Sequence, residues 1–107
     1  MGLDISHGRP AWRSTGNWRF PLVAEVAGEW WVLRINGFPD HDLWTLFIDG
    51  VVRGDLTAVP AGWGKLDMWA APTLEPALVA AVLAPVAGFA VYGSEVGQPC
   101  DGPFCCG

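Results

Sequence analysis

Apolar and polar side chains alternate along two neighbouring segments in the first half of the chain. Between Asn17 and Val26 the apolar side chains take the even positions, which is the period of a strand with one buried face. The next apolar segment, Glu29–Asn36, follows directly after Ala27-Gly28, so the two segments are predicted to form a hairpin. Because Pro21 has no N–H to donate, we expect the first strand at the edge of the sheet or with a bulge at this residue.

A second hairpin is predicted after the first. Leu43–Ile48 has the pattern of a strand, and Asp49-Gly50 is a strong signal for a two-residue hairpin turn that leads into Val51–Arg53. Strands that follow one another through short connections usually pair with their neighbours. The first half of the chain therefore predicts a four-stranded antiparallel meander.

The second half predicts a long loop and one helix. Residues 57–73 hold several Pro and Gly residues and show no clear period, which is typical of a loop, and loops of this length are often functional. A helix is predicted from Leu74 to about Ala84, with Thr73 as its N-cap. Its side chains are apolar on most of its surface, so we expect a buried helix across one face of the sheet. Phe89–Tyr92 fits either a second short helix or a fifth strand.

Tryptophans are predicted on both faces of the sheet. The period of two places Trp18 in a packed face, and we expect Trp31 and Trp44 to share the face beneath the helix. Trp30 then lies on the opposite face. That face either stays open or is covered by the long loop and by the N-terminal arm that carries Trp12.

Length and composition limit the number of domains. The chain has 107 residues, which is enough for one hydrophobic core, and its seven tryptophans are more than such a core hides completely. The predicted fold is thus a single α+β domain over residues 1–107. It comprises a four-stranded antiparallel meander, with a fifth strand as an alternative, one buried helix packed on it and a cysteine-bearing C-terminal tail.

Charge narrows the class of partner. Eleven acidic and six basic residues leave a formal net charge of −5, so nucleic acid is not an expected ligand and a basic protein is. The uncharged stretch 76–93 is interrupted by Pro85 and Gly88, so we expect it to be buried in the protein and not in a membrane. The first residues lack the apolar stretch of a secretory signal, which favours a cytoplasmic location. The sequence is also compatible with a homodimer.

Few residues have the arrangement that catalysis or metal binding requires. Asp40-His41-Asp42 brings carboxylates and an imidazole together in sequence, but it also has the composition of an ordinary solvated turn. No nucleophile elbow or phosphate loop accompanies it, so we predict a protein that is not an enzyme and has no cofactor. Cys100, Cys105 and Cys106 are expected to be plain structural cysteines, and two alternatives stay open, a metal- or ligand-binding tail and a disulfide, either local or between molecules. A closed zinc site would need a fourth ligand from His7 or His41.

Several blocks of the sequence carry a resemblance to known proteins. They are Trp30–Pro39, Leu43–Gly50, Tyr92–Gly97, Pro99-Cys100 and Cys105-Cys106. On these blocks the chain resembles small actinobacterial proteins and, more loosely, the immunity proteins of polymorphic and contact-dependent bacterial toxin systems. The looser resemblance implies a small acidic cytosolic α+β protein that binds one toxin domain and blocks its active site or substrate path.

These observations together predict a non-catalytic protein-binding function. The expected role is that of an immunity protein that neutralises a cognate, basic toxin domain. Acidic side chains and two tryptophans of the long loop are the candidate contacts, because tryptophan contributes strongly to protein interfaces and carboxylates attract a basic partner. These candidate residues are Asp40, Asp42, Asp55, Trp63, Asp67 and Trp69.

Overall fold

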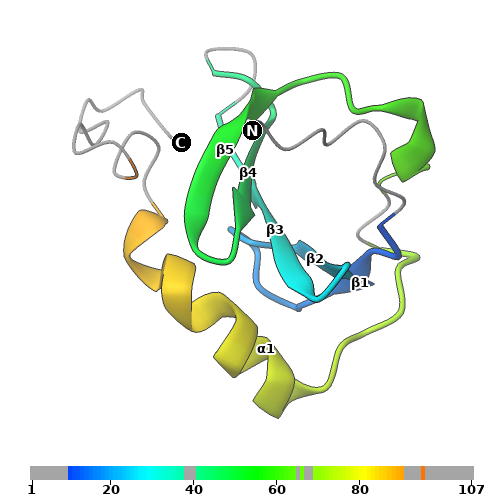
Figure 1. Cartoon of the computed structure of the whole chain (residues 1–107), viewed down its shortest axis with the longest axis vertical. Helices are drawn as coiled ribbons and strands as arrows, with labels where there is room; N and C mark the ends of the chain where they lie inside the picture. Colours follow the sequence, from blue (N-terminus) through cyan, green and yellow to red (C-terminus); the bar gives the residue numbers. More distant parts are fainter. Residues whose placement is uncertain (1–9, 38–40, 65, 67–68, 91–94, 96–107) are drawn as a thin grey trace.

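Five strands form one antiparallel sheet in sequence order (Figure 1). The computed structural model describes residues 10–37, 41–64, 66, 69–90 and 95. The strands are β1 (Arg13–Ser14), β2 (Leu22–Val26), β3 (Glu29–Ile35), β4 (Trp44–Ile48) and β5 (Val51–Leu56). The predicted meander of consecutive hairpins is confirmed.

Two tight turns set the register of the meander. Ala27 and Gly28 have φ values of 53° and 83°, and Asp49 and Gly50 have values of 51° and 83°. Positive φ at both central residues belongs to the turn type whose twist matches that of paired strands. The turns place Ala24 opposite Trp31 and Ile48 opposite Val51.

The fifth strand does not come from Phe89–Tyr92, where the sequence allowed one. Phe89 ends a 3₁₀ helix, Tyr92 lies outside the described residues, and the additional strand is β1. The long loop returns to this strand, because the Ser14 N–H donates to the Pro72 carbonyl at 2.8 Å and the Leu74 N–H donates to the Ser14 carbonyl at 2.9 Å. The C-terminal end of the loop is therefore attached to β1, while its N-terminal end follows directly from β5.

A single α-helix, α1 (Pro76–Leu83), lies across one face of the sheet and continues as the 3₁₀ helix Ala84–Phe89. It begins later than predicted, because the N–H of Leu74 is used by the sheet and Pro76 is suited to the first helical turn. The prediction of a helix buried on most sides is wrong. Of the α1 residues only Val82 and Leu83 are buried, and Leu78 is 38% exposed, since the sheet covers one side of the helix only.

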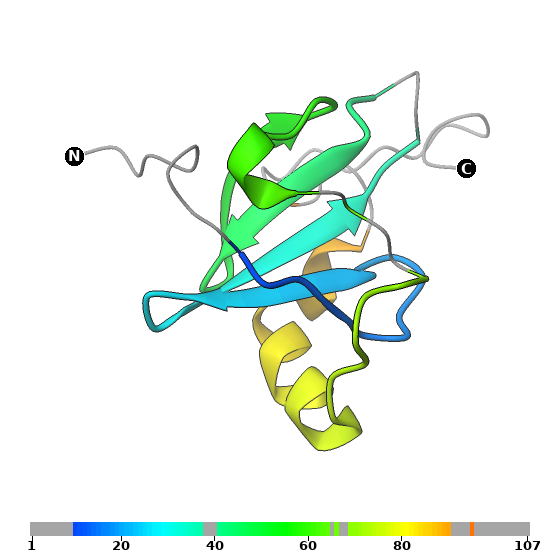
Figure 2. The same ribbon diagram turned by 90° about the vertical axis from the view of Figure 1, so that its right-hand side faces the viewer.

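The sheet separates two hydrophobic clusters, with α1 on one side and the 3₁₀ turn Ala61–Trp63 on the other (Figure 2). Beneath the helix lie Phe20, Val23, Val32, Phe47, Leu74, Val82, Leu83 and Val86. On the opposite face lie Trp12, Leu22, Ala24, Trp31, Leu33, Trp44, Leu46, Ile48 and Trp63. The predicted position of Trp31 and Trp44 beneath the helix is therefore wrong: the arm and the loop cover them. A period of two shows which residues share a face, but not which segment covers it.

Candidate functional site

The structure places the predicted contact residues in different environments. Asp40 and Asp67 lie outside the described residues. Asp42 and Asp55 are exposed, and Trp69 is 91% exposed.

Trp63 is not available to a partner, and its assignment as a surface contact has to be corrected. Its side chain is 3% exposed, and its ring centroid lies 5.3 Å from that of Trp12 and 5.7 Å from that of Trp31. The 3₁₀ turn that carries it folds inward, because the apolar face of the sheet offers a large area for burial. Trp63 is therefore a core residue.

Sequence reasoning missed Trp18, which is 73% exposed. The predicted strand over 17–26 begins only at Leu22, since residues 16–20 form a turn. The Asn17 Oδ1 atom accepts the backbone N–H groups of Arg19 at 2.9 Å and Phe20 at 3.0 Å, a local bonding pattern that competes with a strand. Phe20 therefore packs beneath the helix whereas Leu22 lies on the other face, and the alternation breaks at Pro21.

Local contacts hold the Trp18 turn in place. The Arg19 guanidinium lies over the Trp18 ring, 4.4 Å from its centroid, and its Nη1 atom donates to the Ile35 carbonyl at 3.2 Å. The Thr15 hydroxyl donates to the Phe20 carbonyl at 2.6 Å. These bonds order the turn that carries the exposed indole before any partner arrives.

Trp18 and Trp69 line the same depression, which we call the aromatic hollow. It has a volume of about 280 Å³ and is lined by Ser14, Gly16, Asn17, Trp18, Pro21 and Trp69. A second hollow of about 400 Å³ shares Asn17 and Trp18 and continues along the helix to Ala80, Ala84 and Ala90. Arg19 lines the second hollow, Trp69 lines the first, and Trp18 lines both.

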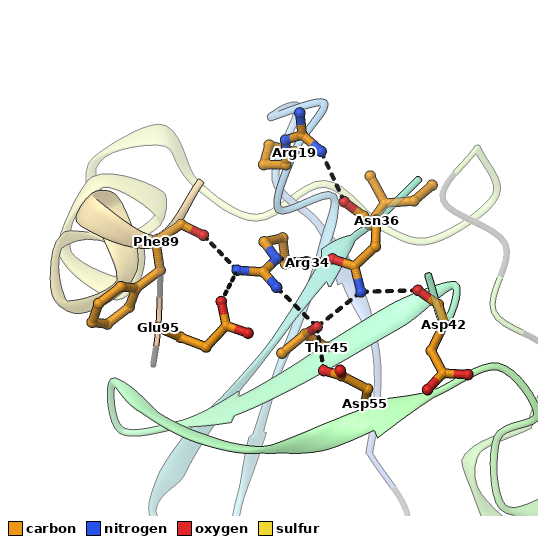
Figure 3. Close-up of polar contacts among 9 residues, drawn as sticks. Arg19, Arg34, Asn36, Asp42, Thr45, Asp55, Phe89 and Glu95 are labelled. Carbon is orange, nitrogen blue, oxygen red and sulfur yellow. Dashed lines mark hydrogen bonds and ion pairs between the residues drawn. The ribbon is translucent and has the colours of Figure 1, made fainter. Parts of the chain in front are cut away.

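A buried polar cluster surrounds Arg34 (Figure 3). The guanidinium has no exposed surface and donates to Glu95 Oε1 at 2.7 Å, to the Phe89 carbonyl at 2.8 Å and to Thr45 Oγ1 at 3.0 Å. Its Nε atom donates to Asn36 Oδ1 at 2.9 Å. The cluster fastens β3, β4 and the chain at Glu95 to one another.

The cluster reaches the surface at two carboxylate residues. The Thr45 hydroxyl accepts bonds from Arg34 and from the Asn36 amide and donates to Asp55 Oδ1 at 2.7 Å. The Asn36 amide also donates to the Asp42 carbonyl at 2.9 Å. Thr45 is buried and uses its proton and both lone pairs in these bonds, so it is a positioning group and not a free nucleophile.

Of the Asp40-His41-Asp42 segment the structure describes His41 and Asp42, and both are hydrogen-bonded to other residues. The His41 backbone N–H donates to the Gly37 carbonyl at 2.7 Å, and the Asp42 carboxylate accepts from the Thr57 hydroxyl at 2.8 Å. In the part of the chain that the structure describes, no three His, Cys, Asp or Glu residues are grouped as metal ligands. Cys100, Cys105 and Cys106 lie outside that part.

The meander brings the exposed groups to one end of the sheet. We call it the Trp18 end, where β2 and β4 begin and β1, β3 and β5 finish. At the β1–β2 side it carries Trp18 and the aromatic hollow, and at the β4–β5 side it carries Asp42 and Asp55. The sheet order therefore unites residues that the sequence keeps well apart.

Comparisons with known proteins do not suggest a function, so a function has to be argued from the fold and from the Trp18 end of the sheet. No protein-family model matches the chain, and neither the curated proteins nor the solved structures contain a match. None of the helices in the described ranges combines the length and the apolar character that a membrane crossing requires.

Proposed function

We propose that the chain is a non-catalytic protein-binding module that contacts its partner through the Trp18 end of the sheet. The observation that carries the proposal is the pairing of Trp18, 73% exposed, with Trp69, 91% exposed, along one hollow. Large apolar side chains that share a patch are typical of binding sites, and tryptophan is among the residues that dominate the energetics of protein interfaces.

The Trp18 turn is ordered in a way that favours binding. A side chain that is fixed before association loses less conformational entropy when the partner docks. The bonds of Asn17 to the turn and the contact between Arg19 and Trp18 both restrict this indole. More of the free energy from burying the indole is then left for affinity.

In its specific form, the proposed function is neutralisation of a bacterial toxin domain of basic character. The formal net charge of −5 supports it, as do the exposed carboxylates of Asp42 and Asp55, which lie at the β4–β5 side of the same end of the sheet. Charge complementarity of this kind accelerates association and selects against wrong partners.

The test is calorimetric binding of the toxin domain encoded beside this chain. We expect Trp18→Ala and Trp69→Ala each to weaken binding by about tenfold or more, since central tryptophans usually contribute over 1.4 kcal/mol. Asp42→Lys should slow association, with the larger effect at low salt. Val51→Ala is the matched control, because Val51 is 53% exposed and is not among the residues that line the hollow.

Two outcomes contradict the proposal. If wild-type protein does not bind the toxin domain, the immunity role is wrong. If the domain is bound but all three variants bind as tightly as Val51→Ala, the contact surface lies elsewhere. Circular dichroism of each variant checks that the exposed substitutions leave the fold intact.

A further inference from the structure

The hydrogen bonds of the buried cluster run in one direction, from Arg34 outward to Asp55 (Figure 3). A guanidinium group has donors only, and that of Arg34 donates to Asn36 Oδ1 at 2.9 Å and to the Thr45 hydroxyl oxygen at 3.0 Å. The Asn36 amide nitrogen also donates to the Thr45 hydroxyl oxygen, at 2.8 Å. Two donors therefore face this oxygen, and the hydroxyl proton has to point toward a third group.

The third group is the Asp55 carboxylate. Its Oδ1 atom lies 2.7 Å from the Thr45 hydroxyl oxygen, and it is the acceptor among the three described groups bonded to that hydroxyl. Thr45 is buried on the interior strand β4, whereas Asp55 is exposed on the edge strand β5. The bond thus ties an exposed carboxylate to a buried group that two further bonds hold in place.

Asp42, the other described carboxylate of the predicted contacts, is held differently. Its Oδ1 atom accepts from the Thr57 hydroxyl at 2.8 Å, and Thr57 is itself exposed. An exposed hydroxyl exchanges its bonds with water more readily than a buried one, so this bond restricts the carboxylate less. Of the two carboxylates, Asp55 has the orientation that the interior of the protein determines.

We infer that Thr45 is a positioning residue for partner binding, which fixes the Asp55 carboxylate for a cationic side chain of the partner protein. This inference rests on the proposed function and names the group that prepares its acidic side. A side chain whose orientation is fixed before association loses less conformational entropy when the partner docks. Long-range attraction, by contrast, depends on the charge and acts on the association rate. Thr45 should therefore affect the dissociation rate, and the charge of Asp55 both rates.

The experiment measures both rates by surface plasmon resonance, with the full chain and the toxin domain encoded beside it. Asp55→Asn removes the charge and should slow association, with the larger effect at low salt. Thr45→Val removes the hydroxyl at nearly constant shape, and it should leave the association rate within about twofold and raise the dissociation rate about fivefold. Thr45→Ser keeps the hydroxyl and should restore the wild-type dissociation rate, and Val51→Ala is the control.

A second variant separates positioning from stability. Thr45→Val leaves the donors of Arg34 and Asn36 without this acceptor, so it should also destabilise the fold. Asp55→Glu changes an exposed residue, keeps the charge and displaces the carboxylate from the Thr45 hydroxyl. It should raise the dissociation rate as Thr45→Val does, with the association rate again within about twofold. Circular dichroism checks that each variant is folded.

The outcomes separate this inference from the proposed function. If the wild-type chain does not bind the toxin domain, the proposed function is wrong. If it binds, but Thr45→Val and Asp55→Glu dissociate at the wild-type rate, the binding function stands and the positioning inference is wrong. A Thr45→Ser variant that dissociates as fast as Thr45→Val would also overturn the inference, because the hydroxyl would then not be the group responsible.

The free chain gives a further test that needs no partner. Nuclear magnetic resonance couplings between the α and β protons of Asp55 report how many side-chain rotamers this residue occupies. We expect one rotamer in the wild type and in Thr45→Ser, and averaged couplings in Thr45→Val. Averaged couplings in the wild type would overturn the inference whether or not the toxin domain binds.

Discussion

The guanidinium of Arg34 has no exposed surface, so the folded state must supply hydrogen-bond acceptors in place of the water that burial removes. It donates to Asn36, Thr45, Phe89 and Glu95, and it lies 5.4 Å from the centroid of the Phe47 ring. The Glu95 side chain that balances its charge is 6% exposed. Removing one member of such a pair leaves the other charge buried without compensation, which is the more costly change.

We therefore predict that Arg34→Met lowers the free energy of unfolding by about 3–5 kcal/mol. Glu95→Gln added to Arg34→Met should restore part of the loss, because no buried carboxylate then lacks its cation. Arg53→Met is the control, since Arg53 is exposed on β5 and should change stability by no more than about 0.5 kcal/mol. Urea denaturation measures all three, and equal values for Arg34→Met and Arg53→Met would contradict the role assigned to the cluster.

Sequence reasoning could assign the face of Arg34 but not its partners. Alternation places Arg34 on the same side of its strand as Val32 and Asn36. The acceptors at Phe89 and Glu95 lie 55 and 61 residues further along the chain, and no local pattern joins them to β3. A buried ion pair across such a separation becomes visible only when the tertiary structure is known.

Among the elements, the start of the 3₁₀ helix Ala84–Phe89 and the β4–β5 turn are in close contact. A Cβ atom added at Gly50 would lie 2.7 Å from the Cβ of Pro85, whereas one added at Gly28 would meet no atom within 4 Å. Both glycines have a φ of +83°, so their backbone strain on substitution should be similar. Comparing Gly28 with Gly50 therefore separates two contributions to the free energy of unfolding, the contact with Pro85 and the left-handed backbone conformation.

Gly28→Ala should accordingly cost about 1–2 kcal/mol, from the left-handed conformation alone. Gly50→Ala should cost a further 1–3 kcal/mol or so, because Pro85 and the 3₁₀ helix must shift. Thermal and urea unfolding of both variants measure the difference. If the two substitutions are equally costly, the helical segment does not rest on the turn as the structure has it.

At this scale the strong local signals were reliable and the weaker ones were not. Ala27-Gly28 and Asp49-Gly50 predicted both hairpins, because two residues with positive φ determine the turn by themselves. The period of two over 17–26 failed at its beginning. There, the Asn17 side chain accepts backbone N–H groups, and Pro21 has no N–H to donate to a strand. A pattern of hydrophobic and polar positions contains neither effect.

In the part of the chain that the structure describes, the sheet has a cover on each face, and six tryptophans are divided between the interior and the Trp18 end, while Trp30 is half-buried at the start of β3. Trp12, Trp31, Trp44 and Trp63 are buried on the face that the arm and the long loop cover. Composition predicted that some tryptophans would stay exposed, but not which ones. The path of the irregular loop decides that: it turns Trp63 inward and leaves Trp69 outside, and sequence periodicity carries no information on a segment without regular structure.

Trp63→Ala tests whether this second cover is part of the cooperative core. The indole contacts Trp12 and Trp31, so its removal should open a cavity between the arm and the sheet and cost about 3–5 kcal/mol. Trp69→Ala, in the same loop but 91% exposed, should stay within about 0.5 kcal/mol of the wild type. Urea unfolding followed by circular dichroism gives both values, and a near-neutral Trp63→Ala would mean that the loop folds independently of the sheet. A large loss for Trp63→Ala beside an unchanged Trp69→Ala would instead give the two tryptophans separate roles, with Trp63 stabilising the fold and Trp69 contributing to the binding surface.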